Sequence, residues 1–216
     1  MTSHEVAVVD YGAGNVRSVA KALEYVGSVP VVTSDPEVIR QARSLILPGQ
    51  GACGSAMKAL EQRNLIEPIL SAVRTGVPFF GVCLGLHLLF DRSEESNGPC
   101  LGLLPGKVRR LPADVKVPHM GWNTVSFLKD HPVFEGIPQN THFYFVHSYY
   151  SDPTESCSVL GVTSYGTEFC SVVARGSMVA TQFHPEKSGK WGLRIYANFL
   201  NMARDCVVQR GCSEAV

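Results

Sequence analysis

The stretch that decides the fold covers residues 77–90 and reads Val77-Pro78-Phe79-Phe80-Gly81-Val82-Cys83-Leu84-Gly85-Leu86-His87-Leu88-Leu89-Phe90. The apolar run after Pro78 is typical of a fully buried parallel strand, and the residues after it are typical of a turn into an apolar helix. Gly81 and Gly85 stand two residues before and two residues after Cys83, where they leave room for a close approach of the backbone. The pattern predicts a nucleophile elbow with Cys83 at its strained tip.

Cys83 is the reactive residue of this hypothesis. A thiolate attacks carbonyl carbon, and the start of a helix favours the thiolate over the thiol. On composition alone, a lone cysteine is more often a structural residue of a hydrophobic core. The elbow by itself favours the reactive interpretation only modestly, so the rest of the chain has to supply a base and an acid.

Composition limits the classes of protein to which the chain can belong. Its 216 residues suffice for one domain with a sizeable core, which we expect over residues 1–204 with a loose tail over 205–216, although two smaller domains would also fit. Nineteen basic residues balance nineteen acidic ones, so neither nucleic acid nor a membrane is an expected partner. The N-terminus lacks the features of a signal peptide, which predicts a cytoplasmic location.

The cysteines predict neither a metal site nor a disulfide framework. They number seven, are scattered, and include no C-x-x-C pair; they stand at positions 53, 83, 100, 157, 170, 206 and 212. We interpret them as reduced thiols. No metal and no cofactor is expected.

Strands and helices alternate over the first ninety residues. We expect strands at 5–10, 29–33 and 44–47, and helices at 16–26 and 53–63. This alternation predicts an α/β fold with a central mixed, mostly parallel sheet flanked by helices, of the flavodoxin-like kind. Ligands bind beyond the carboxyl ends of such strands, where the glycine turns at 12–14 and 49–51 and the elbow all fall.

The second half of the chain predicts antiparallel strands. After a region rich in Gly, Pro and charge, with one short strand at 107–111, we expect strands at 124–127, 142–147, 157–163, 168–174 and 178–183. A last helix is expected at 188–204. The early pair Gly12-x-Gly14 is a weak match to a dinucleotide-binding turn, because Arg17 occupies the third glycine position. A turn for chain reversal is the better interpretation.

His184 is the candidate base, because it follows an apolar strand and therefore stands at the strand end where the elbow also lies. Glu186, two residues on, would select the ring tautomer and stabilise the imidazolium. His-Pro-Glu also occurs as an ordinary surface turn, and spacing alone does not decide between the two. Four rival histidines, for which a structural role is the default, are His119, His131, His142 and His147.

An oxyanion intermediate would need two hydrogen-bond donors. The elbow supplies one from the N–H of Leu84, the residue after the nucleophile. The natural candidate for the second is the loop Gly49-Gln50-Gly51, because its glycines permit unusual peptide orientations. An ordinary strand-to-helix turn is the alternative for this loop.

Together these residues resemble the class I glutamine amidotransferase family. The two motifs that carry the resemblance are Gly81-Val82-Cys83-Leu84-Gly85 and His184-Pro185-Glu186, with 101 positions from Cys83 to His184. Further stretches resemble the branch of the family that serves histidine biosynthesis: Asp10-Tyr11-Gly12-Ala13-Gly14-Asn15, Leu47-Pro48-Gly49-Gln50-Gly51, His119-Met120-Gly121-Trp122-Asn123 and Phe143-Tyr144-Phe145-Val146-His147-Ser148-Tyr149. The resemblance spans about residues 5–204.

The resemblance implies a reaction and roles for particular residues. Cys83 would attack the side-chain amide of L-glutamine to give a glutamyl thioester, while His184, held by Glu186, moves the protons. The backbone at Gly51, Ser148 and Tyr149 would bind the amino-acid part of glutamine, and a backbone flip at Gly49 and Gln50 would aim the second oxyanion donor.

Two positions depart from the family pattern. His87 stands where members commonly have a glutamine whose amide helps to hold the substrate; a histidine can donate a hydrogen bond there, or it faces the helix packing instead. Gln50 stands where a small apolar residue is frequent.

Chemistry gives a separate reason to expect a partner protein. Ammonia must stay unprotonated to act as a nucleophile, which requires a protected path to its acceptor. The resemblance implies a cyclase subunit of the (β/α)8-barrel type, in a heterodimer, whose ligand activates this chain. Family positions near that interface are Asn15, Trp122, Tyr144 and Lys187, although a core role for the two aromatic residues is equally open.

Three alternatives differ in testable ways. Glutaminase subunits of anthranilate or aminodeoxychorismate synthase usually carry His-Gln after the second glycine of the elbow, where this chain has Leu86-His87. Cysteine hydrolases of the DJ-1/PfpI type usually have His directly after the cysteine, and Leu84 argues against them. A non-catalytic binding module that kept the fold is the third, and a glutaminase assay with the candidate partner separates these cases.

Overall fold

The computed structural model describes residues 6–96 and 98–213. Within them a thirteen-stranded sheet begins with five parallel strands, in the spatial order β2 (Pro30–Thr33), β1 (Val6–Val9), β3 (Leu45–Leu47), β4 (Phe79–Val82) and β13 (Met178–Thr181). All four residues of β4 are buried, because the strand has neighbours on both sides and helices over both faces. The apolar run after Pro78 therefore forms the buried parallel strand that the sequence predicts.

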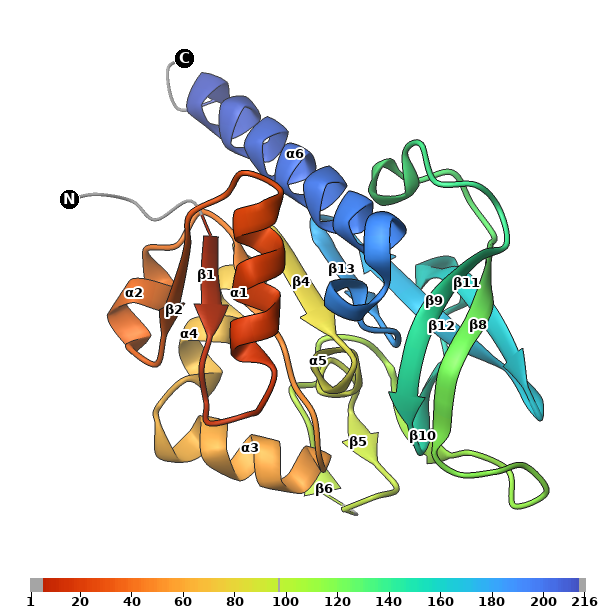
Figure 1. Ribbon diagram of the computed structural model, residues 1–216. Helices are drawn as coiled ribbons and strands as arrows, with labels where there is room; N and C mark the ends of the chain where they lie inside the picture. Colours follow the sequence, from red (N-terminus) through yellow and green to blue (C-terminus); the bar gives the residue numbers. More distant parts are fainter. Residues whose placement is uncertain (1–5, 97, 214–216) are drawn as a thin grey trace.

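Helices cover both faces of this parallel sheet (Figure 1). Val6 and Val8 pack with α1 (Val16–Tyr25) and α6 (Gly189–Ser213). Ala7 and Val9 point to the other face and pack with α2 (Pro36–Arg40), α3 (Cys53–Gln62) and α4 (Ile66–Arg74). The alternation follows from the two-residue period of a strand, and it confirms the α/β class.

The second half of the chain extends the same sheet with mostly antiparallel strands. β13 pairs in parallel with β4 and antiparallel with β12 (Thr167–Arg175), so it joins the two halves into the mixed sheet that the sequence predicts. Beyond β12 the sheet continues through β10 (Tyr149–Pro153), β7 (Gly106–Arg110), β5 (Arg92–Ser93) and β6 (Gly98–Pro99). A branch pairs β12 with β11 (Val159–Tyr165), then β8 (His119–Phe127) and β9 (Thr141–His147). The described residues also form three short 3-10 helices, η1 (Pro132–Phe134), η2 (Ser156–Ser158) and η3 (Pro185–Lys187).

Several elements differ from the sequence-based expectation. β8 begins at His119 rather than near Thr124, and β10 and α4 were not expected. The helix after the elbow, α5 (Leu84–His87), is only one turn long. α6 continues to Ser213, past the expected end at residue 204, so residues 205–213 are helical rather than loose. The single domain over residues 1–204 stays a prediction.

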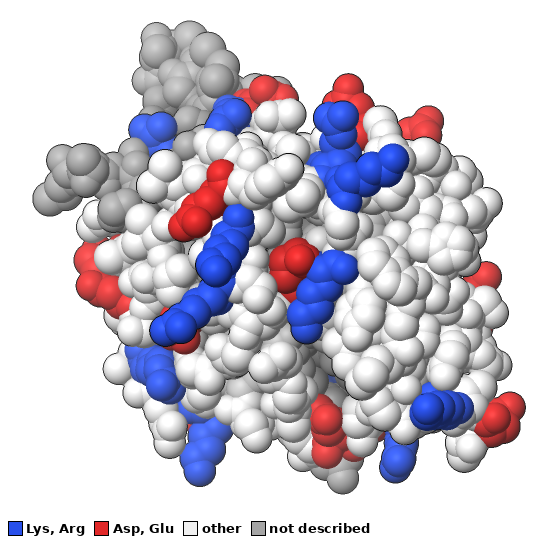
Figure 2. Space-filling view, viewed as in Figure 1, with Lys and Arg blue, Asp and Glu red and all other residues white. Residues whose placement is uncertain are grey.

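The surface carries charges of both signs, as the neutral composition requires. Figure 2 shows them interspersed on this face, with the widest uncharged area over the part of the molecule that holds β8 and β9. None of the helices in the described part of the chain has the length and apolar composition needed to cross a membrane. The six cysteines whose side chains are described are free thiols.

Candidate active site

The elbow at Cys83 is a strained turn, as the glycine spacing predicts. Cys83 lies between β4 and α5 with φ 52° and ψ −99°, a conformation that costs about 1–3 kcal/mol for a residue with a side chain. A Cβ added to Gly85 would lie 2.0 Å from the carbonyl oxygen of Leu47, and one added to Gly81 would lie 2.9 Å from the Cβ of Ala180. Both neighbours are glycine because the adjacent strands approach too closely for any side chain.

The short α5 changes the account of how a thiolate would be favoured. A helix of four residues aligns too few peptide dipoles to produce the partial charge of a full helix terminus. The polar groups nearest Sγ of Cys83 are Nε2 of Gln182 at 3.8 Å, which donates to the sulfur, and the carbonyl oxygen of Val146 at 4.0 Å, which accepts from the thiol. Gln182 is fully buried, and its Oε1 lies 2.8 Å from Nε2 of His87, so the histidine fixes the amide with its NH2 toward the sulfur.

His184 and Glu186 form a buried hydrogen-bonded pair at the end of β13. Nδ1 of His184 donates to Oε1 of Glu186 at 2.8 Å, and the two side chains are 1% and 0% exposed. Oε2 of Glu186 accepts from the hydroxyl of Tyr196 at 3.1 Å, and Oε1 also accepts from Nδ2 of Asn15. Asn15 reaches the carboxylate because it ends the β1–α1 turn in a left-handed conformation, with φ 79°. His184 presents its other nitrogen, Nε2, which has no partner among the described residues, to the cavity at Cys83.

These contacts favour the charged form of His184. Burial alone would lower the pKa of His184, but the charge of an ionised Cys83 and the hydrogen bond to Glu186 outweigh it and raise this pKa from 6.5 to about 10. Burial likewise opposes ionisation of Glu186, but hydrogen bonds from His184 and Asn15 bring its pKa below the ordinary value. The arrangement favours an imidazolium held by the Glu186 carboxylate at neutral pH.

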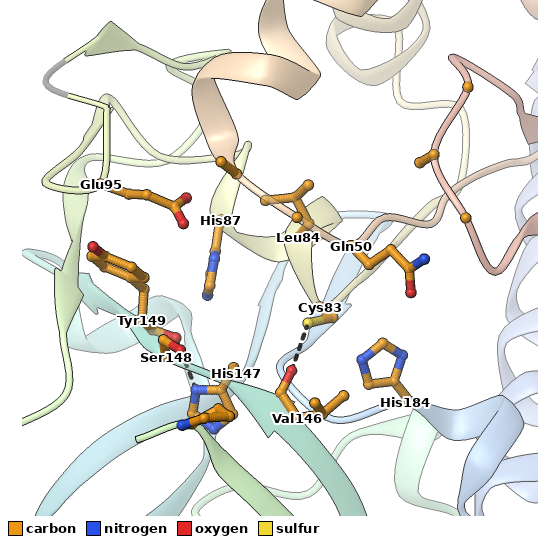
Figure 3. A pocket seen from close by; sticks show the side chains of 16 residues that line it. Gln50, Cys83, Leu84, His87, Glu95, Val146, His147, Ser148, Tyr149 and His184 are labelled. Carbon is orange, nitrogen blue, oxygen red and sulfur yellow. Dashed lines mark hydrogen bonds between the residues drawn. The ribbon is translucent and has the colours of Figure 1, made fainter. Parts of the chain in front are cut away.

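Cys83 and His184 line the same cavity, of about 670 Å³. Figure 3 shows the imidazole of His184 and the sulfur of Cys83 close together at one end, near Gln50, with Tyr149 and Glu95 at the other end. The cavity is bordered by residues of seven chain segments: Gly12, Ala13, Gly14, Gln50, Gly51, Ala52, Cys83, Leu84, His87, Glu95, Pro118, Val146, His147, Ser148, Tyr149 and His184. The three glycine turns that the sequence places at one sheet edge do meet there.

The predicted substrate-contacting residues border this cavity, and one unpredicted residue, Glu95, joins them. Gly51, His87, Ser148 and Tyr149 all lie on its wall, and His87 is 5% exposed with its ring bonded to Gln182. Gln182, which contacts Cys83 but does not line the cavity, was missed, although a glutamine directly after the apolar strand β13 is a signal of a buried polar role. Glu95 was also missed, and nothing in its sequence neighbourhood indicates that it reaches the cavity.

The four rival histidines have other partners or surroundings. Nδ1 of His147 donates to the carbonyl oxygen of Tyr149 at 2.8 Å, and its Nε2 accepts from Nδ1 of His119 at 2.9 Å. Burial lowers the pKa of His147 to about 3 and that of His119 to about 4, so both rings stay neutral and hold the Tyr149 carbonyl in place. His131 caps η1 by accepting from the N–H of Val133, and His142 is exposed.

The expected interface residues divide into two groups. Trp122 on β8 is 56% exposed and lies opposite Tyr144 on β9, with ring centroids 6.1 Å apart, so this pair is at the surface rather than in the core. Lys187 is also exposed. Asn15 is half-buried, and its side chain is engaged with Glu186, which ties it to the site itself.

Comparison with known proteins identifies the class that this geometry represents. Residues 7–203 match the family described as Glutamine amidotransferase class-I, and the chain belongs to that family. It is 50% identical over 210 residues to the imidazole glycerol phosphate synthase subunit HisH of Aromatoleum aromaticum, covering 92% of this chain and 99% of the relative. It is 51% identical over 201 residues to the HisH subunit of Nitrosococcus oceani, covering 90% and 96% of the two chains.

Solved structures agree on the fold. A structure described as a glutamine amidotransferase has a TM-score of 0.73 at 22% identity, covering 92% of this chain and 98% of the other. A chain of the PurLQS structure from Thermotoga maritima has a TM-score of 0.74 at 18% identity, covering 93% and 99%. The HisH relatives are named as subunits of a synthase, which means that they work with a further subunit.

Proposed function

We propose that this chain is the glutaminase subunit of imidazole glycerol phosphate synthase. It hydrolyses L-glutamine to glutamate and ammonia, and passes the ammonia to a cyclase partner in histidine biosynthesis. The observation that carries the proposal is one cavity in which a strained cysteine meets a buried His–Glu pair, in a chain half-identical to HisH subunits over nearly their whole length. The reduced cysteines fit a cytoplasmic protein.

Glutamine binds with its amino-acid part at the end of the cavity away from His184. Glu95 is the carboxylate on the wall there, and its Oε2 accepts from the N–H of Cys53 at 2.9 Å, which holds it in place for an ammonium group. Backbone groups of Gly51, Ser148 and Tyr149 bind the rest of the amino-acid part. The side-chain amide then extends past His87 to the sulfur of Cys83.

Acylation begins from the thiolate and the imidazolium. Sγ of Cys83 attacks the amide carbon of glutamine, and the carbonyl electrons move onto oxygen to give a tetrahedral oxyanion. As the intermediate collapses, the C–N bond breaks and Nε2 of His184 gives its proton to the departing nitrogen. The products of this step are ammonia, a glutamyl thioester on Cys83 and a neutral His184.

Deacylation returns the site to its starting state. Neutral His184 accepts a proton from water through Nε2, and the hydroxide attacks the thioester carbon. The second tetrahedral intermediate expels the thiolate of Cys83, and the new side-chain carboxyl group loses its proton to solvent as glutamate is released. Glu186 holds the ring in one tautomer through Nδ1 and stabilises the imidazolium that each cycle regenerates.

Two backbone donors stabilise both oxyanions. The N–H of Leu84 lies in the first turn of α5, where no carbonyl precedes it at helical spacing, so it is available to the substrate oxygen. The loop Gly49-Gln50-Gly51 supplies the second donor, with φ +96° at Gly51 as one sign of its unusual backbone.

The partner is a cyclase subunit of the (β/α)8-barrel type, which docks where ammonia leaves the site. Met120 and Trp122 on β8 are 63% and 56% exposed, an unusual exposure for large apolar side chains. Met120 lies opposite Val146 in the β8–β9 register, and Val146 borders the cavity. An apolar surface thus begins next to the reaction chamber, and Tyr144, Asn15 and Lys187 lie on the neighbouring segments.

The decisive experiment replaces the nucleophile in the complex with the cyclase from the same organism. Cys83→Ala should abolish glutamate release from glutamine, while synthesis driven by added ammonia and binding of the cyclase persist. Cys157→Ala is the matched control, because Cys157 is exposed and absent from the cavity wall. Undiminished glutaminase turnover in Cys83→Ala would refute the assignment of the nucleophile, and failure of the wild-type complex to use glutamine would refute the proposed function.

A further inference from the structure

Tyr11 carries a buried hydroxyl that the mechanism above leaves unused. The residue follows β1 and is 3% exposed, and its hydroxyl oxygen has no hydrogen-bond partner among the described residues. Burial and the nearby sulfurs of Cys83 and Cys53 raise the pKa of Tyr11 above its ordinary value, so the hydroxyl keeps its proton and acts as a donor. A buried donor without an acceptor destabilises the state in which it occurs.

The hydroxyl lies directly under the loop that supplies the second oxyanion donor. A Cβ added to Gly49 would lie 2.3 Å from the hydroxyl oxygen of Tyr11 and 3.0 Å from the Cβ of Leu84. Gly49 precedes the cavity-lining residues Gln50 and Gly51, and its α-carbon lies next to the Tyr11 hydroxyl. The same contact requires glycine at this position.

Peptide geometry connects the hydroxyl to the oxyanion. In a trans peptide the carbonyl of Gly49 and the N–H of Gln50 belong to one planar unit and point in opposite directions. When the N–H of Gln50 turns toward the cavity to meet the oxyanion, the carbonyl of Gly49 must turn toward the protein interior. The buried donor next to the α-carbon of Gly49 is the hydroxyl of Tyr11, which has no other partner among the described residues.

We propose that the Tyr11 hydroxyl donates a hydrogen bond to the carbonyl of Gly49 when the N–H of Gln50 faces the oxyanion. Tyr11 is then a positioning residue: it stabilises the active orientation of the loop and gains its missing acceptor only in that orientation. The inference rests on the proposed glutaminase function. It also explains why a hydroxyl is buried where phenylalanine would fill the same space without an unpaired donor.

Tyr11→Phe tests the proposal because it removes only the hydroxyl. The full-length variant in complex with the cyclase subunit should show a kcat for glutamine hydrolysis about tenfold lower, because a hydrogen bond made only in the active orientation is lost. The KM for glutamine should stay within twofold. Alkylation of Cys83 by iodoacetamide, which needs no oxyanion donor, should proceed at the wild-type rate.

The thermal stability of the free chain separates this role from a structural one. Since the hydroxyl is unpaired in the resting loop, Tyr11→Phe should leave the Tm of the free chain unchanged or raise it. Tyr25→Phe is the control, because Tyr25 is 79% exposed. A Tyr11→Phe variant that keeps a kcat within twofold of wild type, or whose activity falls together with its Tm or its alkylation rate, overturns the proposal. A wild-type complex without glutaminase activity instead refutes the function on which it rests.

Discussion

Replacing Glu186 with glutamine tests how the buried carboxylate acts on His184. The side-chain shape is retained, and the amide oxygen of Glu186→Gln can still accept from Nδ1 of His184 and Nδ2 of Asn15. The new NH2 then faces Tyr196, whose hydroxyl can accept in place of donating. The fold should therefore tolerate the change, and only the charge is lost.

The magnitude follows from the hydrogen bond that remains. The bond from the imidazolium changes from one between two charged groups to one with a single charge, and we take the loss of stabilisation as about 1.4 kcal/mol. This corresponds to about one pKa unit for His184 and to about a tenfold lower kcat. The pKa of His184, about 10 in the wild type, still keeps the ring charged at neutral pH. The loss thus falls on deacylation, in which neutral His184 becomes an imidazolium, and does not come from loss of the proton in the resting site.

The assay is glutamate release by the complex with its cyclase subunit, measured from pH 6.5 to pH 10.5. Glu186→Gln should lower kcat about tenfold, leave the KM for glutamine unchanged, and move the alkaline limb of the pH profile down by about one unit. A kcat within twofold of wild type with an unmoved alkaline limb would show that Glu186 does not act on His184. The Tm of the free variant, expected near that of wild type, excludes a folding defect.

Three further predictions concern stability, the elbow and the partner. The pKa of His184 is raised from 6.5 to about 10, so its contribution to stability is full below pH 6.5 and is lost as the pH rises toward 10. Thermal melts of the free chain should show this loss of stability. In Cys83→Ala the loss should be smaller, because the charge that raises the His184 pKa most is gone. Gly85→Ala should lower the free energy of unfolding by about 1–3 kcal/mol in denaturant titrations and reduce glutaminase activity, since its Cβ would lie 2.0 Å from the Leu47 carbonyl oxygen. Trp122→Ala should raise the Kd for the cyclase about thirtyfold, the effect of losing about 2 kcal/mol at an interface anchor, in a calorimetric titration.

Matched controls exist for the last two variants. Gly27 has φ +88° with open space around its α-carbon, so Gly27→Ala carries backbone strain but no clash, and its glutaminase activity should stay at the wild-type level. Leu128 is 54% exposed and lies near the end of β8 away from Met120, so Leu128→Ala should leave cyclase affinity unchanged. Equal effects of Trp122→Ala and Leu128→Ala would place the interface elsewhere.

Local signals in the sequence were sufficient for the elbow and for the parallel half of the sheet. A buried parallel strand is a continuous apolar run, and glycines two residues from Cys83 report the close approach of neighbouring strands. The strand-end position of His184 followed from the apolar run before it. Each of these inferences needs only the residues next to one another in the chain.

The sequence analysis missed or shortened those elements whose residue pattern does not indicate their secondary structure. α4 carries Pro68 in its first turn, which looks like a breaker although proline is tolerated there. β8 contains Gly121 at φ +140° and exposes Met120 and Trp122, so its alternation of apolar and polar residues is hidden. The last part of α6, residues 205–213, mixes Val207 and Val208 with polar residues and contains Gly211, so no clear apolar stripe predicts that the helix continues.

Contacts between remote residues lie outside any single-sequence pattern. Gln182 reaches the sulfur of Cys83 across 99 positions, and Glu95 reaches the N–H of Cys53 across 42. The contact of Tyr11 with Gly49 is of the same kind, since it joins the loops after two neighbouring strands. The order of strands in the sheet decides which remote residues meet. The sequence predicts the class of the sheet but not the order of its strands.

Several features that cost free energy lie around the loop Gly49-Gln50-Gly51 and the sulfur of Cys83. Cys83 has a strained backbone, the hydroxyl of Tyr11 has no acceptor, and Nε2 of His184 has no partner, all within or beneath the wall of one cavity. Each costs about 1–3 kcal/mol, a large part of the net stability of a domain, and the surrounding buried strands offset these costs. Substrate supplies a partner for His184, and a turned Gly49 peptide supplies one for Tyr11. Because both are satisfied only in the loaded site, the resting chain should hydrolyse glutamine slowly until the cyclase and its ligand favour the turned loop.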